Sequence, residues 1–239
     1  MGKVLVIEHG SGGPLALFDE WFEQAGVEVD VARPYAGDVV PDIPDRNALV
    51  VLGGPMGAYD DADYPWLAGT KRLLSAYVSE GRPTMGICLG HQLLTVACGG
   101  EVIRNPDGKQ MGLRDVGLGP EASDDPLFGA LVPPVRSVHW NDDVVSRLPD
   151  GAVPLAAGAE GWPQAYRLGQ TAWGVQFHPE VGAAQVSGWA KESEPGPGTA
   201  GRDFGAAVRA IEVAEGELRR TWQPFASRFA ALVNGERSA

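Results

Sequence analysis

Hydrophobic positions in the first half of the chain repeat with two alternating periods. Short β-rich runs at residues 3–7, 27–31 and 48–52 predict strands. Hydrophobic residues three or four positions apart predict helices at residues 14–24 and 66–78. The run at 48–52 is apolar throughout, as expected of a parallel strand buried on both faces. This order of strands and helices predicts a doubly wound, mostly parallel sheet with flanking helices.

The second half of the chain has a different pattern. From about residue 101 the helical spacing gives way to short strand-like runs at close intervals, which indicates antiparallel pairing. These runs lie at residues 102–104, 113–118, 135–139, 153–157, 164–168 and 171–177. We therefore expect an α/β fold that contains a small antiparallel part.

The last part of the chain returns to helical spacing. Residues 194–201 are rich in proline and glycine and predict a loop. Beyond the loop we expect a pair of helices, with Pro224 in the first turn of the second helix and Thr221 as its N-cap. The expected organisation is a domain over residues 1–184 and a helical extension over 185–239 that packs on the same domain.

One cysteine lies where a chain can present a nucleophilic thiol. Within residues 84–92 a short apolar run ends at Cys88, which is flanked by Gly86 and Gly90 and followed by an apolar helical segment. The glycines allow a tight strand-to-helix turn, which is the geometry of the nucleophile elbow in serine hydrolases. The unpaired amides and the dipole at a helix N-terminus favour the thiolate form of a cysteine placed there. From these residues alone, a buried structural cysteine is the alternative.

Composition and charge narrow the context. The 239 residues contain 31 acidic and 19 basic side chains, for a net charge of −12, and no cluster of Lys and Arg forms a basic patch. This argues against nucleic acid or an anionic membrane as the main partner. The start of the chain lacks the features of a secretory signal, and no apolar run reaches the roughly 20 residues of a membrane span, so we expect a cytoplasmic protein. Cys98, the second cysteine, is interpreted as a core residue.

A cysteine nucleophile needs a base and usually a third group that orients the base. His178 and Glu180 are separated by one proline at the end of a strand, so their side chains face the same side and can form a hydrogen bond. The competing candidate is His139, which is followed closely by Asp142 and Asp143. The proline-fixed pair is favoured because it supplies both a base and its orienting group.

With these residues in place, the chain resembles the class I glutamine amidotransferases, and specifically the free-standing, GMP-synthase-like members of that family. Three elements match in order and spacing over roughly residues 3–184: Gly53-Gly-Pro55 after a strand, Gly86-Ile-Cys-Leu-Gly-His-Gln92 at the elbow, and Gly174-Val-Gln-Phe-His-Pro-Glu180. The combination is far more specific than any single motif. It implies the flavodoxin-like fold of this family over residues 1–184.

The resemblance also implies a role for individual residues. The family's catalytic triad carries over to Cys88, His178 and Glu180. The amides of Gly54 and Leu89 correspond to the oxyanion hole. The glutamine that ends the elbow motif, Gln92, corresponds to a substrate contact.

One motif departs from the family pattern. Free-standing members often read His-Trp-His-Gly-Asp where this chain reads His139-Trp-Asn-Asp-Asp143. In the family this loop helps to hold the amino-acid end of glutamine, so Trp140 and Asn141 are expected to contact the substrate. The extra carboxylate of Asp142 is expected either to repel the substrate α-carboxylate or to attract an amine of a different γ-glutamyl compound.

The resemblance leaves three classes of function. The leading class hydrolyses the γ-carboxamide of glutamine through a γ-glutamyl-Cys88 thioester and delivers ammonia to an acceptor or to a synthetase on another chain, because no synthetase domain is recognisable in these 239 residues. The second is a stand-alone γ-glutamyl hydrolase or peptidase that acts on γ-glutamyl amides. The third, a non-catalytic regulatory subunit, is disfavoured by the intact triad. No metal or cofactor is expected.

Overall fold

The structure is a computed structural model that describes residues 1–192 and 203–236; the loop expected at 194–201 lies outside these ranges. The strands are β1 (Lys3–Ile7), β2 (Glu28–Ala32), β3 (Ala48–Val51), β4 (Thr84–Ile87), β5 (Glu101–Arg104), β6 (Gln110–Asp115), β7 (Arg136–Asn141), β8 (Asp143–Arg147), β9 (Val153–Ala157), β10 (Pro163–Leu168) and β11 (Ala172–Val175). The α-helices are α1 (Leu17–Gln24), α2 (Trp66–Ser79), α3 (Leu89–Ala97), α4 (Ala183–Glu192) and α5 (Phe204–Val233).

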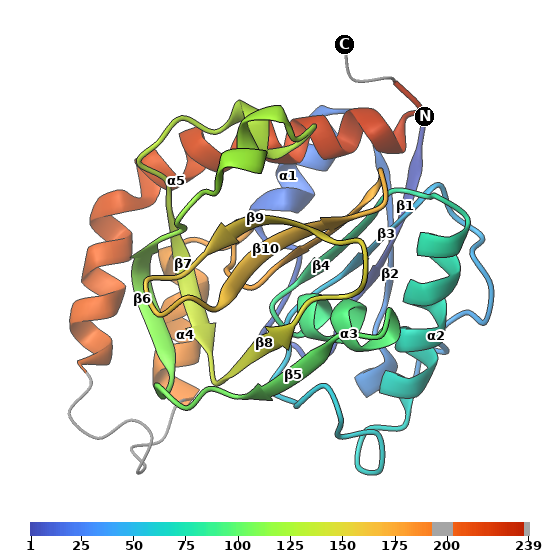
Figure 1. Cartoon of the computed structure of the whole chain (residues 1–239), viewed down its shortest axis with the longest axis horizontal. Coiled ribbons are helices and arrows are strands. Elements are labelled where there is room, and N and C mark those ends of the chain that lie inside the picture. The colour runs from blue at the N-terminus through green and yellow to red at the C-terminus, as the bar shows by residue number, and fades with distance from the viewer. Residues whose placement is uncertain (193–202, 237–239) are drawn as a thin grey trace.

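A seven-stranded sheet forms the centre of the molecule, with the strand order β2-β1-β3-β4-β11-β10-β9 (Figure 1). The strands from β2 to β11 are parallel neighbours, and β10 and β9 continue the sheet antiparallel. β1 is the point where the chain reverses direction across the sheet, since β2 lies on one side of it and β3 on the other. Ligands bind at such points in doubly wound folds, outside the carboxyl ends of the strands.

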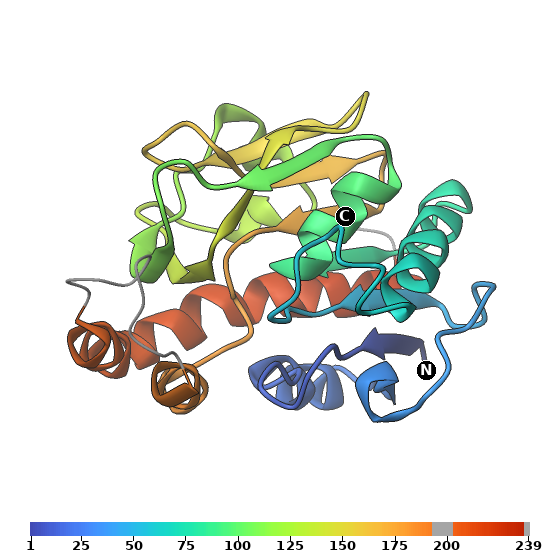
Figure 2. The ribbon, with the colours of Figure 1, turned by 90° about the horizontal axis from the view of Figure 1, so that it is seen from below.

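Helices cover both faces of this sheet, and Figure 2 shows α1 and α3 on opposite sides of it. One hydrophobic cluster joins α1 and α5 to the sheet through large side chains that include Phe18, Trp21 and Phe229. A second cluster joins α2 and α3 to the other face, with Leu73 and Leu93 among its members. The sequence prediction of a doubly wound α/β fold with flanking helices is confirmed.

The antiparallel part contains more strand pairs than the sequence pattern indicates. Besides β9 and β10 it contains two separate strand pairs, β5 with β8 and β6 with β7. The β8 strand has no counterpart among the predicted strands, because it follows β7 after a single residue and the pattern does not separate the two. The strand predicted at 113–118 is found at Gln110–Asp115 instead, so it begins earlier in the chain.

The expected helix pair at the C-terminus is wrong, because residues 204–233 form one continuous helix with Pro224 in its interior. A proline inside a helix costs about 3 kcal/mol, since it removes a hydrogen bond and crowds the preceding turn. Pro224 lies on the solvent-exposed side, whereas its neighbours Trp222 and Phe225 are fully buried against the core. Burying side chains of this size contributes about 1.5–3 kcal/mol each, which offsets the cost of the proline.

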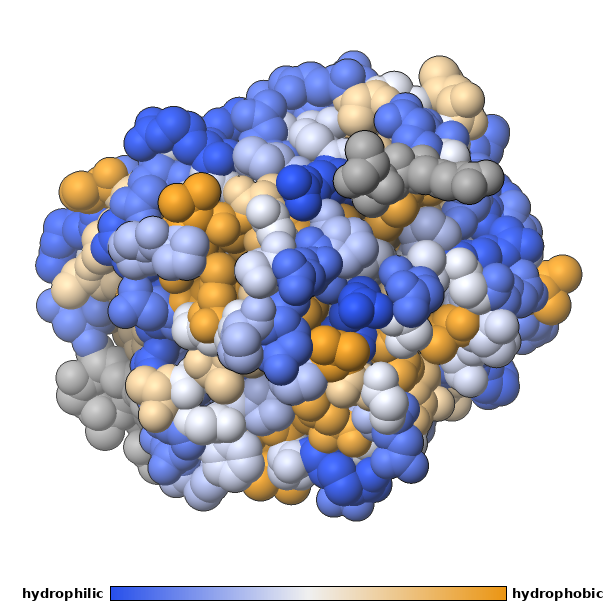
Figure 3. Space-filling view, turned by 45° about the horizontal axis from the view of Figure 1, so that its top comes forward, coloured by the Kyte–Doolittle hydropathy of each residue, from blue (hydrophilic) through white to orange (hydrophobic). Residues whose placement is uncertain are grey.

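The surface is mainly polar. On the face in Figure 3, hydrophilic residues predominate and hydrophobic residues occur in separate groups between them. Within residues 1–192 and 203–236, no helix combines the length and the apolar character that crossing a membrane requires.

Candidate active site

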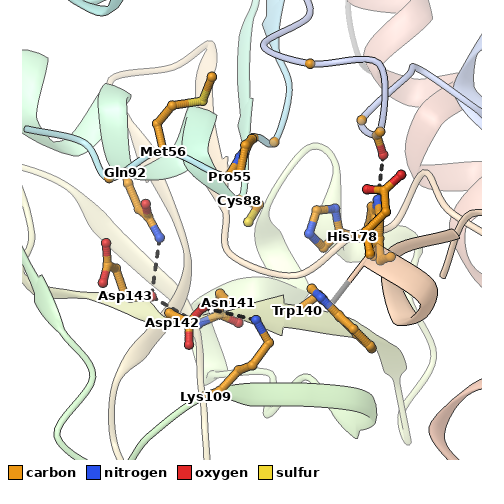
Figure 4. Close-up of a pocket in the computed structure, with 18 of the residues that line it drawn as sticks. Pro55, Met56, Cys88, Gln92, Lys109, Trp140, Asn141, Asp142, Asp143 and His178 are labelled. Carbon is orange, nitrogen blue, oxygen red and sulfur yellow. Dashed lines mark hydrogen bonds and ion pairs between the residues drawn. The ribbon is translucent and has the colours of Figure 1, made fainter. Parts of the chain in front are cut away.

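Four parallel strands end at one edge of the sheet, and the segments that follow them line a single cavity of about 720 Å³. Residues 10–13 follow β1, residues 53–57 follow β3, Cys88 follows β4, and His178 lies shortly after β11. Figure 4 shows Cys88 between Gln92 on one side and His178 on the other. The topology therefore brings together motifs that are far apart along the chain.

Cys88 lies on a strained strand-to-helix turn. Its φ of 53° and ψ of −105° are rarely adopted by residues with a side chain, and such strain persists only where the surrounding structure imposes it. Glycine is required on both sides of the turn because the backbone packs closely there. A β-carbon on Gly90 would lie 1.9 Å from the carbonyl oxygen of Val51, and a β-carbon on Gly86 would lie 2.4 Å from the carbonyl oxygen of Gly90. The turn presents the thiol at the start of α3, as the sequence predicts.

His178 and Glu180 form a buried pair next to the thiol. The His178 Nδ1 and Glu180 Oε1 atoms are 2.8 Å apart, and both residues are buried. Backbone hydrogen bonds fix both ends of the segment, from His178 N to the Val138 carbonyl at 2.8 Å and from Leu17 N to the Glu180 carbonyl at 2.9 Å. The imidazole is thus held in one orientation.

The electrostatic surroundings favour a charged His178. Burial by itself lowers the pKa of this imidazole, but the negative charges of Glu180 and Cys88 raise it, and hydrogen bonds to both partners raise it further. The net result is a pKa well above the ordinary value for histidine. The imidazolium is therefore the favoured form of His178 at neutral pH.

The other three histidines have the opposite environment. Burial lowers the pKa of His9 to about 4 and those of His91 and His139 to about 3, so all three are neutral at physiological pH. His139 packs edge-on against Phe177, and the two aspartates that follow it are paired with cations instead. The structure gives no support to His139 as the base for Cys88.

The glycine loop after β3 approaches the thiol closely. A β-carbon on Gly53 would lie 3.1 Å from His178 Cε1 and 3.5 Å from Cys88 Cβ. One on Gly54 would lie 3.0 Å from Leu89 Cδ2, so the loop packs against the side chain of the first residue of α3. Because Leu89 is the first residue of α3, its amide has no acceptor within the helix and is available to a ligand.

The expected substrate contacts line the cavity, with Gln92 on the opposite side of Cys88 from His178 and Trp140 on the His178 side (Figure 4). The Gln92 amide nitrogen donates to the Asp143 carbonyl at 3.3 Å and to Gln176 Oε1 at 3.2 Å. The Asn141 amide nitrogen donates to the same Asp143 carbonyl at 3.0 Å. Trp140 also lines the cavity, and its ring centroid lies 5.6 Å from the Lys109 ammonium. All three predicted residues are thus in the cavity wall.

Asp142 does not present an uncompensated carboxylate. Its two oxygens lie 3.0 Å from Lys109 Nζ and 3.1 Å from Arg104 Nη2. Arg104 also lies 3.5 Å from Asp143, so the mouth of the cavity carries a small network of both signs. The departure from the family pattern therefore changes the local charge much less than the sequence alone indicates.

Several residues of the cavity are absent from the sequence prediction. These include the glycine-rich loop at residues 10–13, the cations Arg104 and Lys109, and two residues of α4, Trp189 and Glu192. The loop at residues 10–13 could have been predicted, because it directly follows the first predicted strand, where ligands bind in this type of sheet. No local signal marks the others, because they reach the cavity only through the packing of distant elements.

A thiol on a strand-to-helix turn, with an imidazole and a carboxylate behind it, can attack a carbonyl carbon and pass a proton to the leaving group. This fold and site define a class of cysteine-containing α/β proteins suited to acyl transfer. The family model for class I glutamine amidotransferases matches residues 17–186, and the chain belongs to this family.

Relatives with named activities fall into two groups. The chain is 34% identical to one subunit of the glutamine-hydrolysing GMP synthase of Ignicoccus hospitalis, covering 76% of this chain and 90% of that one. It is 29% identical to γ-glutamyl peptidase 3 of Arabidopsis thaliana, covering 71% and 69%. It is also 30% identical to YfeJ, a glutamine amidotransferase-like protein of Salmonella typhimurium, covering 80% and 81%.

Solved structures share the whole fold. The crystal structure of a glutamine amidotransferase from Methylobacillus flagellatus matches with a TM-score of 0.85 and 27% identity, covering 100% of this chain and 97% of the other. The match extends beyond residue 186, where the family model ends. The C-terminal helices therefore have counterparts in a relative.

Proposed function

We propose that this protein hydrolyses a γ-glutamyl amide through a γ-glutamyl thioester on Cys88, with glutamine as the simplest substrate. The observation that carries the proposal is the buried His178–Glu180 pair, separated by 2.8 Å, next to a strained cysteine in a cavity. Two of the named relatives are described as acting on glutamine or on γ-glutamyl compounds, which supports the same chemistry.

In the first half of the reaction the Cys88 thiolate attacks the γ-carbonyl carbon and forms a carbon–sulfur bond. Negative charge develops on the carbonyl oxygen, and in the proposed mechanism the amides of Gly54 and Leu89 donate to it and stabilise it by about 3–4 kcal/mol per donor. His178 donates its proton to the amide nitrogen, the carbon–nitrogen bond breaks, and ammonia or an amine leaves.

In the second half a water molecule enters on the side vacated by the amine. Neutral His178 accepts a proton from this water while the oxygen attacks the thioester carbon. The carbon–sulfur bond breaks, glutamate is released, and the thiolate is restored. Glu180 holds the imidazole in place and stabilises its charged form throughout.

Delivery of ammonia to a synthetase on another chain is the leading fate of the released nitrogen. The similarity to one subunit of a GMP synthase supports it, since that relative is itself part of a larger enzyme. A second candidate, partner-free hydrolysis of larger γ-glutamyl amides, is favoured by the size of the cavity. Its volume of about 720 Å³ lies in the range of sites that hold drug-sized ligands, well beyond the needs of glutamine alone.

A substrate panel tests the proposal. The purified protein is incubated with glutamine and with a series of γ-glutamyl amides, and glutamate release is measured together with trapping of the thioester by hydroxylamine. Release from glutamine that rises strongly with a synthetase supports ammonia delivery, whereas partner-free cleavage of the larger amides supports the second candidate. Failure to release glutamate from any substrate, with no thioester trapped, would refute the proposed chemistry and favour a regulatory role.

A further inference from the structure

The α4 helix closes the active-site cavity on the side of His178. It begins three residues after Glu180, and its Trp189 ring lies 4.7 Å from the His178 ring, measured between centroids. Trp189 and Glu192 both line the cavity. These two residues lie beyond residue 186, where the family model ends, so they are not part of the shared motifs.

Two hydrogen bonds attach α4 to the loop after β1. The Gln185 and Trp189 side chains donate to the same acceptor, the Gly12 carbonyl oxygen, at 2.6 and 2.5 Å. Trp189 also packs against Trp140, with centroids 6.0 Å apart. The helix and the loop thereby form a continuous wall that is held by contacts from two sides.

The chemistry determines which part of the substrate faces this wall. His178 has to protonate the leaving nitrogen, so the amine must lie on the His178 side of Cys88. Of the expected substrate contacts, Gln92 and Asn141 lie farther from His178, whereas Trp140 lies on the His178 side, where it packs against Trp189 (Figure 4). Any group attached to the leaving nitrogen therefore extends toward α4.

Glu192 is the charged residue of this wall. A β-carbon on Gly12 would lie 3.6 Å from Glu192 Oε2, which places the carboxylate against the loop at the cavity. In the part of the chain that the structure describes, Glu180, Asp142 and Asp143 form ion pairs, whereas Glu192 and Asp60 do not. Asp60 accepts a hydrogen bond from the Gly57 amide at 2.7 Å. The charge of Glu192 is thus available to a ligand.

We propose that α4 forms the leaving-group subsite, in which Trp189 contacts the carbon chain of the amine and Glu192 selects γ-glutamyl amides whose amine carries a second positive charge. This inference rests on the proposed γ-glutamyl chemistry at Cys88. An aromatic ring and a carboxylate in one cavity wall suit an alkyl chain that ends in an ammonium group, because the ring contacts the chain and the carboxylate attracts the cation.

The test of Glu192 uses three γ-glutamyl amides that differ only at the far end of a four-carbon amine, which is a methyl, an ammonium or a carboxylate group. We expect wild-type kcat/KM to fall in the order ammonium, methyl, carboxylate. Glu192→Gln should lower the ammonium-to-methyl ratio about three- to fivefold, the size typical of a partly exposed ion pair. Glu212→Gln, an exposed α5 residue outside the cavity, is the matched control and should leave the ratio at the wild-type value.

The outcomes separate the two proposals. If the wild type cleaves the amides but shows no preference for the ammonium compound, or if Glu192→Gln leaves the ratio unchanged, the assignment of Glu192 is overturned while the chemistry at Cys88 stands. If the wild type cleaves none of the amides and no glutamine, the proposed function fails and the subsite fails with it.

Trp189 is tested with the uncharged butylamide and with glutamine, whose leaving group is too small to reach α4. We expect Trp189→Ala to lower kcat/KM for the butylamide about tenfold relative to glutamine measured in the same variant, because the chain loses its apolar contact. Trp189→Phe should recover most of this ratio. Parallel changes for both substrates in Trp189→Ala would show that the ring only supports His178 and would overturn its place in the subsite.

Discussion

The two walls of the active-site cavity are built in different ways. The wall at Cys88 consists of backbone segments that directly follow β3 and β4, where an added β-carbon would lie 3.1 Å from its nearest neighbour at Gly53 and 2.8 Å at Gly54. The wall opposite is α4, which presents the side chains of Trp189 and Glu192. In the proposed mechanism the backbone at the sheet edge acts in steps common to all substrates, whereas the side chains of α4 contact the part that differs between substrates.

Substitutions in the two walls should therefore affect activity in different ways. Changes at the sheet edge should reduce turnover of every γ-glutamyl substrate by similar factors. Changes on α4 should alter the ratio between substrates.

Loss of the thiol should have the largest effect. Cys88→Ala is expected to lower kcat for glutamine by at least about 10⁴-fold, because the covalent step is lost. Cys98→Ala is the matched control: this thiol is half-buried and burial raises its pKa to about 11, so it is unreactive at neutral pH. Labelling by a glutamine-derived electrophile, read by mass spectrometry, should disappear only in Cys88→Ala. Equal labelling of both variants would contradict the assignment of the nucleophile.

Neutralising the orienting carboxylate should reduce activity and change its pH dependence. Glu180→Gln is expected to lower kcat by about 10²- to 10⁴-fold. Glu180 helps to raise the pKa of His178, so removing its charge lowers that pKa and the imidazolium is lost at lower pH. The basic limb of the kcat/KM profile should therefore shift to lower pH. If the basic limb of the Glu180→Gln profile stays at the wild-type pH, Glu180 does not control the charge of His178.

Displacing the glycine loop should have a smaller effect. In Gly54→Ala the new β-carbon would lie 2.8 Å from His9 Cβ, so the loop and its amide must shift. We expect kcat to fall about 10²-fold for all substrates, comparable to the loss of one oxyanion donor. Gly188→Ala on α4 is the control, because no atom lies within 4 Å of the added carbon. It should keep full activity and gain up to about 1 kcal/mol of stability from helix propensity. If the loss of kcat in Gly54→Ala differs between substrates, the proposed difference between the two walls is contradicted.

Local backbone requirements explain why part of the site could be predicted from the sequence. The Cys88 elbow, the glycine loop after β3 and the His178–Glu180 pair each depend on neighbours within a few residues, so their motifs are visible in a single sequence. The alternation of strands and helices then placed these motifs at one sheet edge, because the carboxyl ends of parallel strands lie together.

Long-range contacts explain the errors. Pro224 was expected to separate two helices, yet the buried faces on both sides of it keep α5 continuous. Asp142 was expected to bring an extra charge to the substrate, yet Lys109 and Arg104 neutralise it from a different strand and loop. His139 was a candidate base, yet its position in β7 buries it away from any acid partner within the described residues.

The sequence by itself determined the doubly wound fold and the three motifs that meet at Cys88, because periodicity and glycine placement are local properties of the chain. Only the tertiary structure decided what surrounds the thiol: α4 against His178, cations against Asp142, and a wall that carries Glu192. The physical reason is that these contacts join residues far apart in sequence, and their energies depend on burial and distance, which exist only once the chain has folded.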